Sequence, residues 1–410
     1  MTPSADAIAD CVLQTFERLP DKRKPRSRSD GSREWVPLSG IVLSRDGELS
    51  CVSLGTGMKC LPQNKLDVAG GNILHDWHAE VVAIRTFNRF LLDECFRISD
   101  SNPNSDSHSV FVHQRPDHEV TDLEPQPFAI RDNVQIHMYC SEAPCGDASM
   151  ELTMEAQEDA TPWTSAPPTV TTEAMPASAG ALRGRSNFSL LGAVRCKPSR
   201  PDAPPTLSKS CTDKLTMKQA TSLLSSITSL LVSPRNAYIQ SLVLPKSQYV
   251  PAACERAFSR TGRLQGLVDD TIHRWRGGYR WQQFDVRPTS REFTWSRRNV
   301  APTQKAVASN LSAVYTPSWQ ETLIGGVLQG RKQTDIRGAS KISRRLSWGL
   351  AMQLAALVAL PLARDVLEQT SYRDVKKYAT LEARIAIKQD VQGHGLGGWV
   401  KNEGDADFQR

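Results

Sequence analysis

Three short segments of this 410-residue chain place a histidine, a glutamate and two cysteines where they could bind a metal and move protons. His78-Ala79-Glu80 lies at the start of one predicted helix, Cys145 follows Pro144 at the start of a second, and Cys211 begins a third. The positive end of a helix favours a thiolate or a bound hydroxide. One histidine with one or two cysteines suits a catalytic zinc ion, which keeps its fourth position for water.

Glu80 follows His78 by two residues, so it cannot easily bind the same ion but can reach its water. Zinc deaminases use this arrangement, in which the glutamate transfers protons. Their usual signature continues as P-C-x-x-C, but Ala148 stands at the second cysteine position here. Cys211, in the polar sequence KSCTDK, is the candidate for the missing ligand. Each motif alone is common, and the three in this order predict a zinc deaminase site.

Four segments resemble the adenosine-to-inosine RNA deaminase domain, and most closely the tRNA-specific adenosine deaminase 1 family. They are GTGMKC (55–60), HDWHAEV (75–81), SEAPCGDASM (141–150) and KSCTDKL (209–215). The resemblance covers the chain from residue 35 to 399, and the SCTDK element is its most specific part. It implies that one zinc ion binds His78, Cys145 and Cys211. It also implies that Glu80 carries a proton from water to N1 of adenine.

The same resemblance implies a buried inositol hexakisphosphate held by basic and aromatic side chains. The matching positions are Arg85, Lys214, Lys332, Tyr372, Lys376, Lys388 and Trp399, with Arg384 as an alternative to Lys388. Ile84 and Met217 stand where some relatives carry arginine, which leaves the exact donor set open. The competing interpretation is that these cations lie on solvated helix faces.

Two basic segments are candidates for RNA contacts. Residues 273–298 contain seven arginines interleaved with six aromatic residues, and such pairs can neutralise phosphates and stack on unpaired bases. We assign RNA contacts here to Arg274, Arg276 and Arg280, and a weaker one to Lys59 beside the glycine turn. The alternative is that the aromatic residues belong to the core. Residues 21–33 carry six basic residues and form either a solvated loop or a second RNA contact.

The elements that position these residues alternate between strands and helices. The periodicity predicts a helix over 4–19, a hairpin around Asp46-Gly47, a helix over 78–96, a strand over 134–139 and a helix over 346–362. This is an α/β plan, and the resemblance implies a cytidine-deaminase-like core, a mixed sheet flanked by helices, with a helical C-terminal elaboration. We expect a single domain over 1–410, with a largely disordered low-complexity insertion at 156–206.

Composition limits the setting of the protein. The net charge is +6, the pI is about 8.8, and the nine cysteines are scattered, which is unlike a disulfide scaffold. The most apolar segment, 354–360, is stopped by Pro361, so we expect no membrane span. We expect an intracellular protein, nuclear or cytoplasmic, with no obligatory protein partner. A bound hexakisphosphate would cancel the net charge, so attraction for RNA must come from local patches.

The sequence favours hydrolytic deamination of adenosine to inosine in tRNA. The resemblance implies adenosine 37, next to the anticodon of alanine tRNA. One alternative is an editor of duplex or messenger RNA; such relatives carry separate duplex-binding modules, for which the chain leaves little room. A nucleoside or cytidine deaminase is disfavoured by the missing P-C-x-x-C. A catalytically inactive RNA-binding module with structural zinc would have no use for Glu80.

Overall fold

An eight-stranded mixed sheet forms the centre of the fold in the computed structural model, which describes residues 2–99, 108–161, 169–170, 180–185, 187–198 and 203–409. The strand order is β11-β10-β6-β2-β3-β13-β14-β15. β6, β10 and β11 are parallel to one another, and the other neighbours are antiparallel. The bounds are β2 (Leu38–Arg45), β3 (Glu48–Thr56), β6 (Val134–Cys140), β10 (Ile239–Pro245), β11 (Asp285–Thr289), β13 (Ser312–Tyr315), β14 (Gln320–Ile324) and β15 (Val327–Leu328).

The hairpin of β2 and β3 shows how local sequence fixes the register of the sheet. Arg45 pairs with Glu48, so Asp46 and Gly47 alone form the turn. Both turn residues have positive φ values, 51° and 90°, as a two-residue type I′ turn requires. The predicted Asp-Gly hairpin is therefore confirmed.

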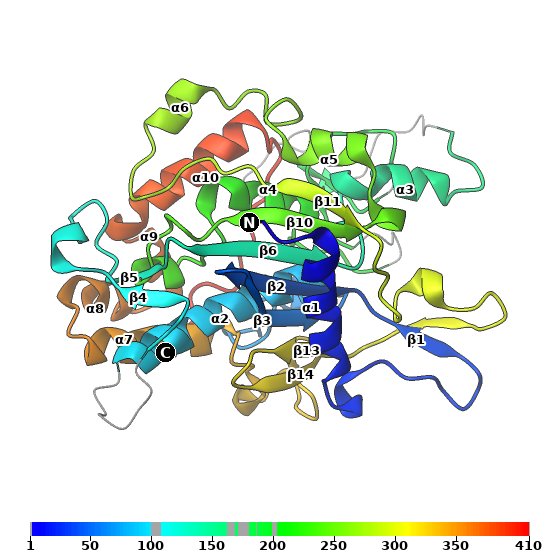
Figure 1. Cartoon of the computed structure of the whole chain (residues 1–410), viewed down its shortest axis with the longest axis horizontal. Helices are drawn as coiled ribbons and strands as arrows, with labels where there is room; N and C mark the ends of the chain where they lie inside the picture. The colour runs from blue at the N-terminus through cyan, green and yellow to red at the C-terminus, as the bar shows by residue number, and fades with distance from the viewer. Residues whose placement is uncertain are drawn as a thin grey trace.

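Helices cover both faces of this sheet (Figure 1). α1 (Ala5–Glu17) packs in a cluster with Val42, whereas α2 (Ala79–Ser99) packs in a cluster with the next residue, Leu43. Successive strand residues point to opposite faces, so the two helices enclose the sheet from either side. The mixed sheet flanked by helices confirms the predicted fold class.

The C-terminal part is helical, as predicted, but the apolar segment 346–362 is two helices. α7 (Arg344–Leu357) ends before Pro361, which occupies the first turn of α8 (Pro361–Leu367). Proline fits that position because its missing N–H has no intrahelical partner there. α9 (Tyr372–Lys377) and α10 (Glu382–His394) complete the chain. No helix in the described part of the chain is long and apolar enough to span a membrane.

Smaller elements surround this framework. They are α3 (Met150–Glu155), α4 (Cys211–Thr221), α5 (Pro251–Phe258), α6 (Asp269–His273), β1 (Arg33–Trp35), β4 (Val112–Gln114), β5 (Phe128–Ile130), β7 (Thr169–Val170), β8 (Ala181–Arg183), β9 (Arg195–Cys196) and β12 (Ala306–Ala308). β1 pairs with β12 in a separate two-stranded parallel sheet.

Part of the interval 156–206 differs from the disordered insertion that its composition predicts. β8 and β9 pair within it, and Phe188 is buried. The guanidinium of the buried Arg195 donates to the carbonyl oxygens of Gly184, Asn187 and Leu190 and so holds this loop in shape. Much of the low-complexity stretch, residues 162–168 and 171–179, lies outside the described residues. The loop is therefore held both by a buried arginine surrounded by carbonyl groups and by apolar residues, Ala181, Val194 and Cys196, that pack in the core.

Candidate active site

The histidine and both cysteines lie at the starts of helical turns, as the sequence predicts. His78 directly precedes α2, Cys211 begins α4, and Cys145 precedes a 3-10 turn at 147–149. The backbone N–H of Cys211 donates to Sγ of Cys145 over 3.3 Å, which brings two distant segments together. Gly146 permits this approach: its φ is 107°, and a Cβ there would lie 2.3 Å from Oγ of Ser210.

Charge and hydrogen bonds favour a thiolate at this junction. The pKa of Cys145 is held well below its usual range, first because Cys211 hydrogen-bonds to it, while burial opposes the shift. His78 and Lys197 also face Cys145 and lower its pKa further. The Lys197 ammonium group donates to Sγ of Cys211 over 3.2 Å. The structure thus brings His78, Cys145 and Cys211 together, with a buried cation beside the sulfur atoms.

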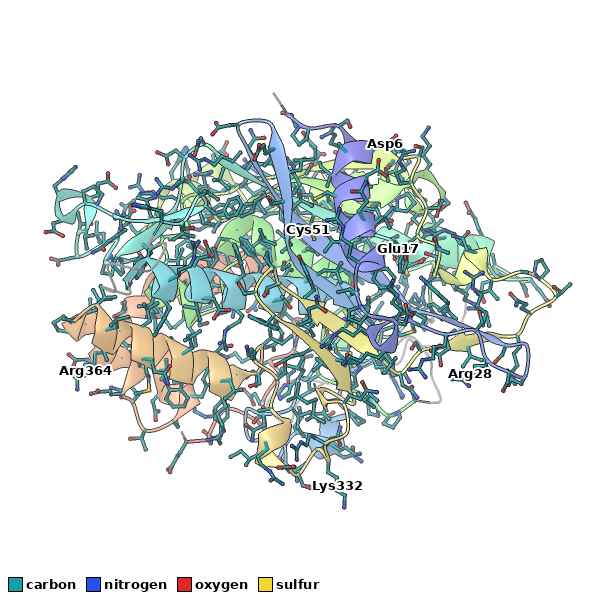
Figure 2. The ribbon with its side chains drawn as sticks, turned by 60° about the horizontal axis from the view of Figure 1, so that its bottom comes forward. Asp6, Glu17, Arg28, Cys51, Lys332 and Arg364 are labelled. Carbon is teal, nitrogen blue, oxygen red and sulfur yellow. The ribbon has the colours of Figure 1, made fainter. Side chains whose placement is uncertain are left out.

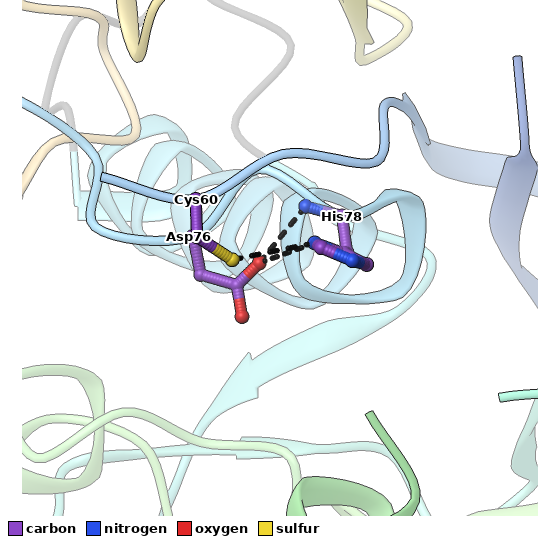
Figure 3. A group of neighbouring side chains, drawn as sticks. All are labelled: Cys60, Asp76 and His78. Carbon is purple, nitrogen blue, oxygen red and sulfur yellow. Dashed lines mark hydrogen bonds and ion pairs between the residues drawn. The ribbon is translucent and has the colours of Figure 1, made fainter. Parts of the chain in front are cut away.

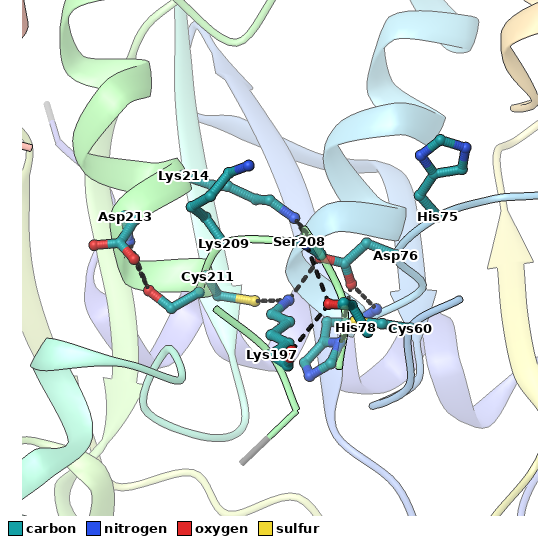
Figure 4. Close-up of polar contacts among 12 residues, drawn as sticks. Cys60, His75, Asp76, His78, Lys197, Ser208, Lys209, Cys211, Asp213 and Lys214 are labelled. Carbon is teal, nitrogen blue, oxygen red and sulfur yellow. Dashed lines mark hydrogen bonds and ion pairs between the residues drawn. The ribbon is translucent and has the colours of Figure 1, made fainter. Parts of the chain in front are cut away.

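A single buried carboxylate, Asp76, connects this junction to the basic residues behind it (Figure 4). It accepts hydrogen bonds from the backbone N–H and Nδ1 of His78 over 3.0 and 2.9 Å. Lys197 donates to it over 2.7 Å, and Lys214 and Ser208 donate as well. Burial alone would raise the pKa of Asp76, but Lys197, Lys214 and His78 outweigh burial and hold it well below its usual range.

Cys60, Asp76 and His78 form a second group that could hold a metal (Figure 3). Their ligand atoms lie within 4.8 Å of one another, and Sγ of Cys60 is 3.6 Å from Nδ1 of His78. However, a carboxylate that already accepts from His78, two lysines and a serine has little capacity left for an ion. Its bond to Nδ1 leaves Nε2 of His78 as the free ligand atom. Metal-binding histidines commonly use their other nitrogen in this way.

Glu80 lies in the first turn of α2 and is buried, with 6% of its surface exposed. Burial raises the pKa of its carboxyl group, and the neighbouring Cys145 raises it further. His78 and Lys197 lower it, but less strongly. A carboxyl group in a dry site with a raised pKa is suited to accept a proton and release it again near neutral pH.

Behind Asp76 the structure gathers a cluster of cations with few counter-charges. Burial first, and then neighbouring cations, lower the pKa of Lys376 to about 8 and that of Lys388 to about 7. All the charged neighbours that shift these two groups are themselves cations. The members of the cluster are Arg85, Lys209, Lys214, Lys218, Arg344, Lys376, Arg384 and Lys388. Like charges gathered this closely repel one another, and either proton loss from the lysines or a bound anion relieves that repulsion.

Most of the side chains predicted to hold the hexakisphosphate lie at this cluster. Tyr372 is buried, and the charged groups of Lys376 and Arg344 each lie 5.9 Å from its ring centre. The Lys209 ammonium group lies 5.2 Å from the ring centre of Trp399. Lys332, by contrast, is exposed on an outer loop (Figure 2). Arg344, at the start of α7, lies in the cluster although the sequence did not assign it there.

The proposed RNA residues are exposed but are not gathered at the site. Arg274, Arg276 and Arg280 all face solvent. Three aromatic residues of the segment 273–298, Trp275, Phe284 and Phe293, are buried in the core. The indole N–H of Trp275 donates to Asp390 over 2.9 Å. The core interpretation therefore accounts for much of the aromatic pattern. Lys59 is exposed at the other side of the site, where it donates to Oδ1 of Asn310.

The last arginine of that segment has a different position. Arg298 donates to the carbonyl oxygen of Ser141 over 2.9 Å and to the carboxylate of Glu142 over 2.7 Å. Glu292 holds the other side of the guanidinium over 2.8 Å. Ser141 and Glu142 begin the loop that carries Cys145, so Arg298 fixes the path of this loop. The sequence marked the segment as basic but did not show that this residue faces inward.

Three connecting residues were missed by sequence reasoning. Asp76 lies in the HDWHAEV motif, two residues before His78, and this spacing could have indicated a carboxylate that orients the imidazole. Lys197 lies in the interval expected to be disordered, so nothing in its local sequence pointed to the site. Arg344 lies at the start of an apolar helix and resembles an ordinary helix-end cation.

A mixed sheet with a buried glutamate beside a histidine and two cysteines is the arrangement typical of a deaminase. Residues 53–403 match the family described as the adenosine-deaminase (editase) domain. The chain is 34% identical over 408 residues to tRNA-specific adenosine deaminase 1 of Schizosaccharomyces pombe, covering 98% of this chain and 96% of that protein. It is also 34% identical over 252 residues to the Saccharomyces cerevisiae protein of the same name, 58% of each chain. A mouse double-stranded RNA-specific adenosine deaminase is 33% identical over 28% of this chain and 9% of its own length.

The chain therefore belongs to the adenosine-deaminase (editase) domain family and, within it, to the family of tRNA-specific adenosine deaminase 1. It is an adenosine deaminase. The family resemblance inferred from the four motifs is confirmed.

Replacement of Arg298 tests whether the Ser141–Glu142 loop must be held in place. Arg298→Gln removes a charged two-sided contact that glutamine cannot reproduce. We expect deaminase kcat/KM to fall about tenfold or more, because small misplacements of catalytic groups are costly. Arg235→Gln is the control, since Arg235 forms a comparable ion pair with Glu124 on the surface. Equal activity of the two variants would show that the loop holds its position without Arg298.

Proposed function

We propose that this chain converts adenosine to inosine in tRNA by zinc-dependent hydrolytic deamination, at adenosine 37 beside the anticodon of alanine tRNA. The observation that carries the reaction is the buried Glu80 next to His78 and Cys145. The tRNA substrate is supported by the 34% identity to tRNA-specific adenosine deaminase 1 over nearly the whole of both chains. An anticodon loop is single-stranded, so its bases cost little to turn out of the stack.

The residues at the junction fit a catalytic zinc ion. His78, Cys145 and Cys211 would supply one nitrogen and two sulfur ligands, and this set leaves a fourth position open. The low pKa of Cys145 supplies a thiolate, which is the form that binds metal. Asp76 orients the imidazole of His78 through Nδ1. When bound, zinc supplies a Lewis acid that makes water nucleophilic near neutral pH.

The chain's own groups then perform the proton transfers. Glu80 accepts a proton from the attacking water and delivers it to N1 of adenine, which makes C6 more electrophilic. The oxygen of that water bonds to C6. The same carboxylate then takes the remaining proton from the new C6 hydroxyl group and passes it to the amino nitrogen; the C6–N bond breaks, ammonia leaves and the C6 carbonyl of inosine remains. The burial of Glu80 supports this role, because its raised pKa lets it hold the proton between the two steps.

The cation cluster fits a polyanion such as inositol hexakisphosphate. Arg85, Lys376 and Lys388 line it from three different helices, and Lys214 joins it to Asp76. Phosphate groups would supply the negative charges that the described residues around Lys376 and Lys388 lack. When bound, such an anion would neutralise the cluster and stabilise the fold by mass action.

Two other functions have less support. An editor of duplex RNA is consistent with the match to the mouse double-stranded RNA-specific enzyme, but that match spans only 28% of this chain. An inactive RNA-binding module would not need a buried acidic group beside the thiolates, because a carboxylate confined there costs free energy.

Activity on tRNA and the role of Glu80 can be tested together. Wild-type protein incubated with unmodified alanine tRNA should produce an A-to-G change at position 37 on sequencing. Glu80→Gln should bind a full equivalent of zinc but lose turnover by at least about a thousandfold, because it cannot carry the proton. Perfect duplex RNA is the comparison substrate. Turnover by Glu80→Gln, or conversion of the duplex but not the tRNA, would contradict the proposal.

The two candidate donor sets make opposite predictions for zinc content. Cys145→Ser and Cys211→Ser should lose most of the metal, because a serine hydroxyl is a poor zinc ligand. Cys60→Ser should retain about one zinc per chain, since Cys60 contacts only the Nδ1 side of His78. Metal analysis of the purified proteins measures this directly. Loss of zinc from Cys60→Ser with retention in Cys145→Ser would move the site to Cys60, Asp76 and His78.

The cluster predicts a pH-dependent stabilisation by inositol hexakisphosphate. In anion-free protein the pKa values of Lys388 and Lys376, about 7 and 8, lie below the usual 10.5 of an unfolded chain. The unfolded chain then binds more protons between pH 7 and 10, so the free energy of unfolding rises with pH in this window. A bound polyanion favours the charged lysines and reverses that slope.

We therefore expect added hexakisphosphate to raise the melting temperature more at pH 7.0 than at pH 9.5. Lys388→Met should weaken both the stabilisation by the anion and the pH dependence of the anion-free protein. The measurement is thermal melting at the two pH values with and without the anion. An equal stabilisation at both pH values would show that these lysines do not face the bound anion.

A further inference from the structure

The basic segment near the N-terminus does not stand alone in the structure. Residues 22–36 and 295–310 lie together at one side of the molecule, where β1 pairs in parallel with β12 (Figure 1). We call these two segments the basic wing. Its outer loop carries Arg28, which in Figure 2 projects on the side opposite Arg364. The wing unites nearly all of the basic segment 21–33 with the end of the basic segment 273–298 and the residues that follow it.

The charge of the basic wing is strongly one-sided. The two segments hold nine lysines and arginines and only two carboxylates, a surplus larger than the net +6 of the whole chain. Glu34 is engaged by Arg28 over 2.8 Å, and Asp30 accepts from Ser32. Three further cations, Arg26, Arg297 and Lys305, are exposed, and their side chains form no ion pair among the described residues.

Aromatic rings shape the same surface. The guanidinium of Arg33 lies 5.0 Å from the ring centre of Trp295, and that of Arg297 lies 6.0 Å from the ring centre of Trp35. Each pair joins one segment of the wing to the other. The guanidinium of Arg33 also donates to the carbonyl oxygens of Thr294 and Asn299, so Arg33 holds the two segments together. The guanidinium of Arg297 has no such contact among the described residues, and its N–H groups can meet phosphate oxygens.

The inner end of the basic wing, around Arg298 and Asn310, contacts the two loops that carry Cys145 and Cys60. On one side, the backbone N–H of Ser309, just after β12, donates to the carbonyl oxygen of Trp35. The side chain of the next residue, Asn310, accepts a hydrogen bond from Lys59. Lys59 adjoins Cys60, whose Sγ is 3.6 Å from His78. On the other side Arg298 holds the loop that leads to Cys145, as described above. The wing therefore adjoins both the loop that carries Cys60 and the loop that carries Cys145.

We propose that the basic wing binds the phosphodiester backbone of the RNA strand that flanks the target adenosine. This inference rests on the proposed function and names the surface that holds its RNA substrate. Free cations without carboxylate partners favour a polyanionic strand over a protein surface of mixed charge. Contacts to phosphate position the substrate without reading its sequence. Selection of the adenosine then belongs to the pocket at Glu80.

The test removes the three free cations and measures the salt dependence of binding. Arg26→Gln, Arg297→Gln and Lys305→Gln are combined in a Glu80→Gln background, so that alanine tRNA is bound but not converted. The matched control combines Arg337→Gln, Arg364→Gln and Lys377→Gln, three exposed cations from another part of the surface. We expect the wing variant to bind roughly 10- to 100-fold more weakly near 0.15 M salt, and its log–log salt slope to be smaller by about 2. The control should match the parent in both respects.

With Glu80 intact, the wing variant should raise KM for tRNA and leave kcat within about twofold, because the contacts lie outside the reacting atoms. Affinity and salt slope equal to those of the control would overturn the proposal and leave the wing as a surface for a protein partner. If the wild type binds RNA through the wing but does not convert adenosine 37, the proposed function fails and the wing stands. If it converts adenosine 37 and the wing variant behaves like the control, only the wing fails.

Discussion

The buried carboxylate of Asp76 is the contact on which the rest of the site depends. It is negative in a position that would strongly disfavour an isolated charge, and it remains so because His78, Lys197 and Lys214 surround it. One of its oxygens orients the imidazole, and the other binds the two ammonium groups. The carboxylate therefore fixes the ligand geometry at the front of the site and ties it to the cations behind. Loss of this charge would leave the buried Lys197 and the half-buried Lys214 without a carboxylate partner.

Through Asp76, the position of the candidate ligand His78 is coupled to the packing of the basic residues behind it. The cations behind Asp76 repel one another, and burial has already displaced the pKa values of Lys376 and Lys388. A fold with so many converging cations is stable only if an anion or proton loss relieves the repulsion. The cluster is drawn from α2, α4, α7, α9 and α10, so whatever anion relieves it also closes the C-terminal helices onto the sheet.

Local sequence was enough to predict that His78, Cys145 and Cys211 come together, but not which residues connect them. His78, Cys145 and Cys211 each lie at a helix start, and a helix start is visible in local sequence. Lys197 and Arg298 act across more than 80 residues of intervening chain, and no spacing rule encodes such a contact. Lys332 is exposed on a loop, whereas Arg344 at the start of α7 lies in the cation cluster. Sequence could not distinguish the two, because a loop cation and a helix-start cation look alike in sequence. The position of Arg344 against Tyr372 exists only after α7 and α9 have packed.

The interval 180–198 shows the same limit from the opposite direction. The low-complexity stretch before it predicts disorder, yet Ala181, Val194 and Cys196 are buried in the hydrophobic core. Local sequence does not reveal that Arg195 holds the loop by donating to three carbonyl groups, or that Lys197 then reaches Cys211. A segment beside a low-complexity stretch can thus contribute a charge to a buried site once its backbone is held in this way.

The distribution of charge separates two tasks that the overall value conceals. The cations around Lys388 point inward and are shielded by the helices that carry them, so they add little to the field felt by a distant polyanion. The basic wing points outward, and its surplus alone exceeds that of the whole chain. The rest of the chain, the inward cations included, is then close to neutral. A net charge of +6 therefore conceals an internal cluster of cations and a separate basic surface that faces solvent.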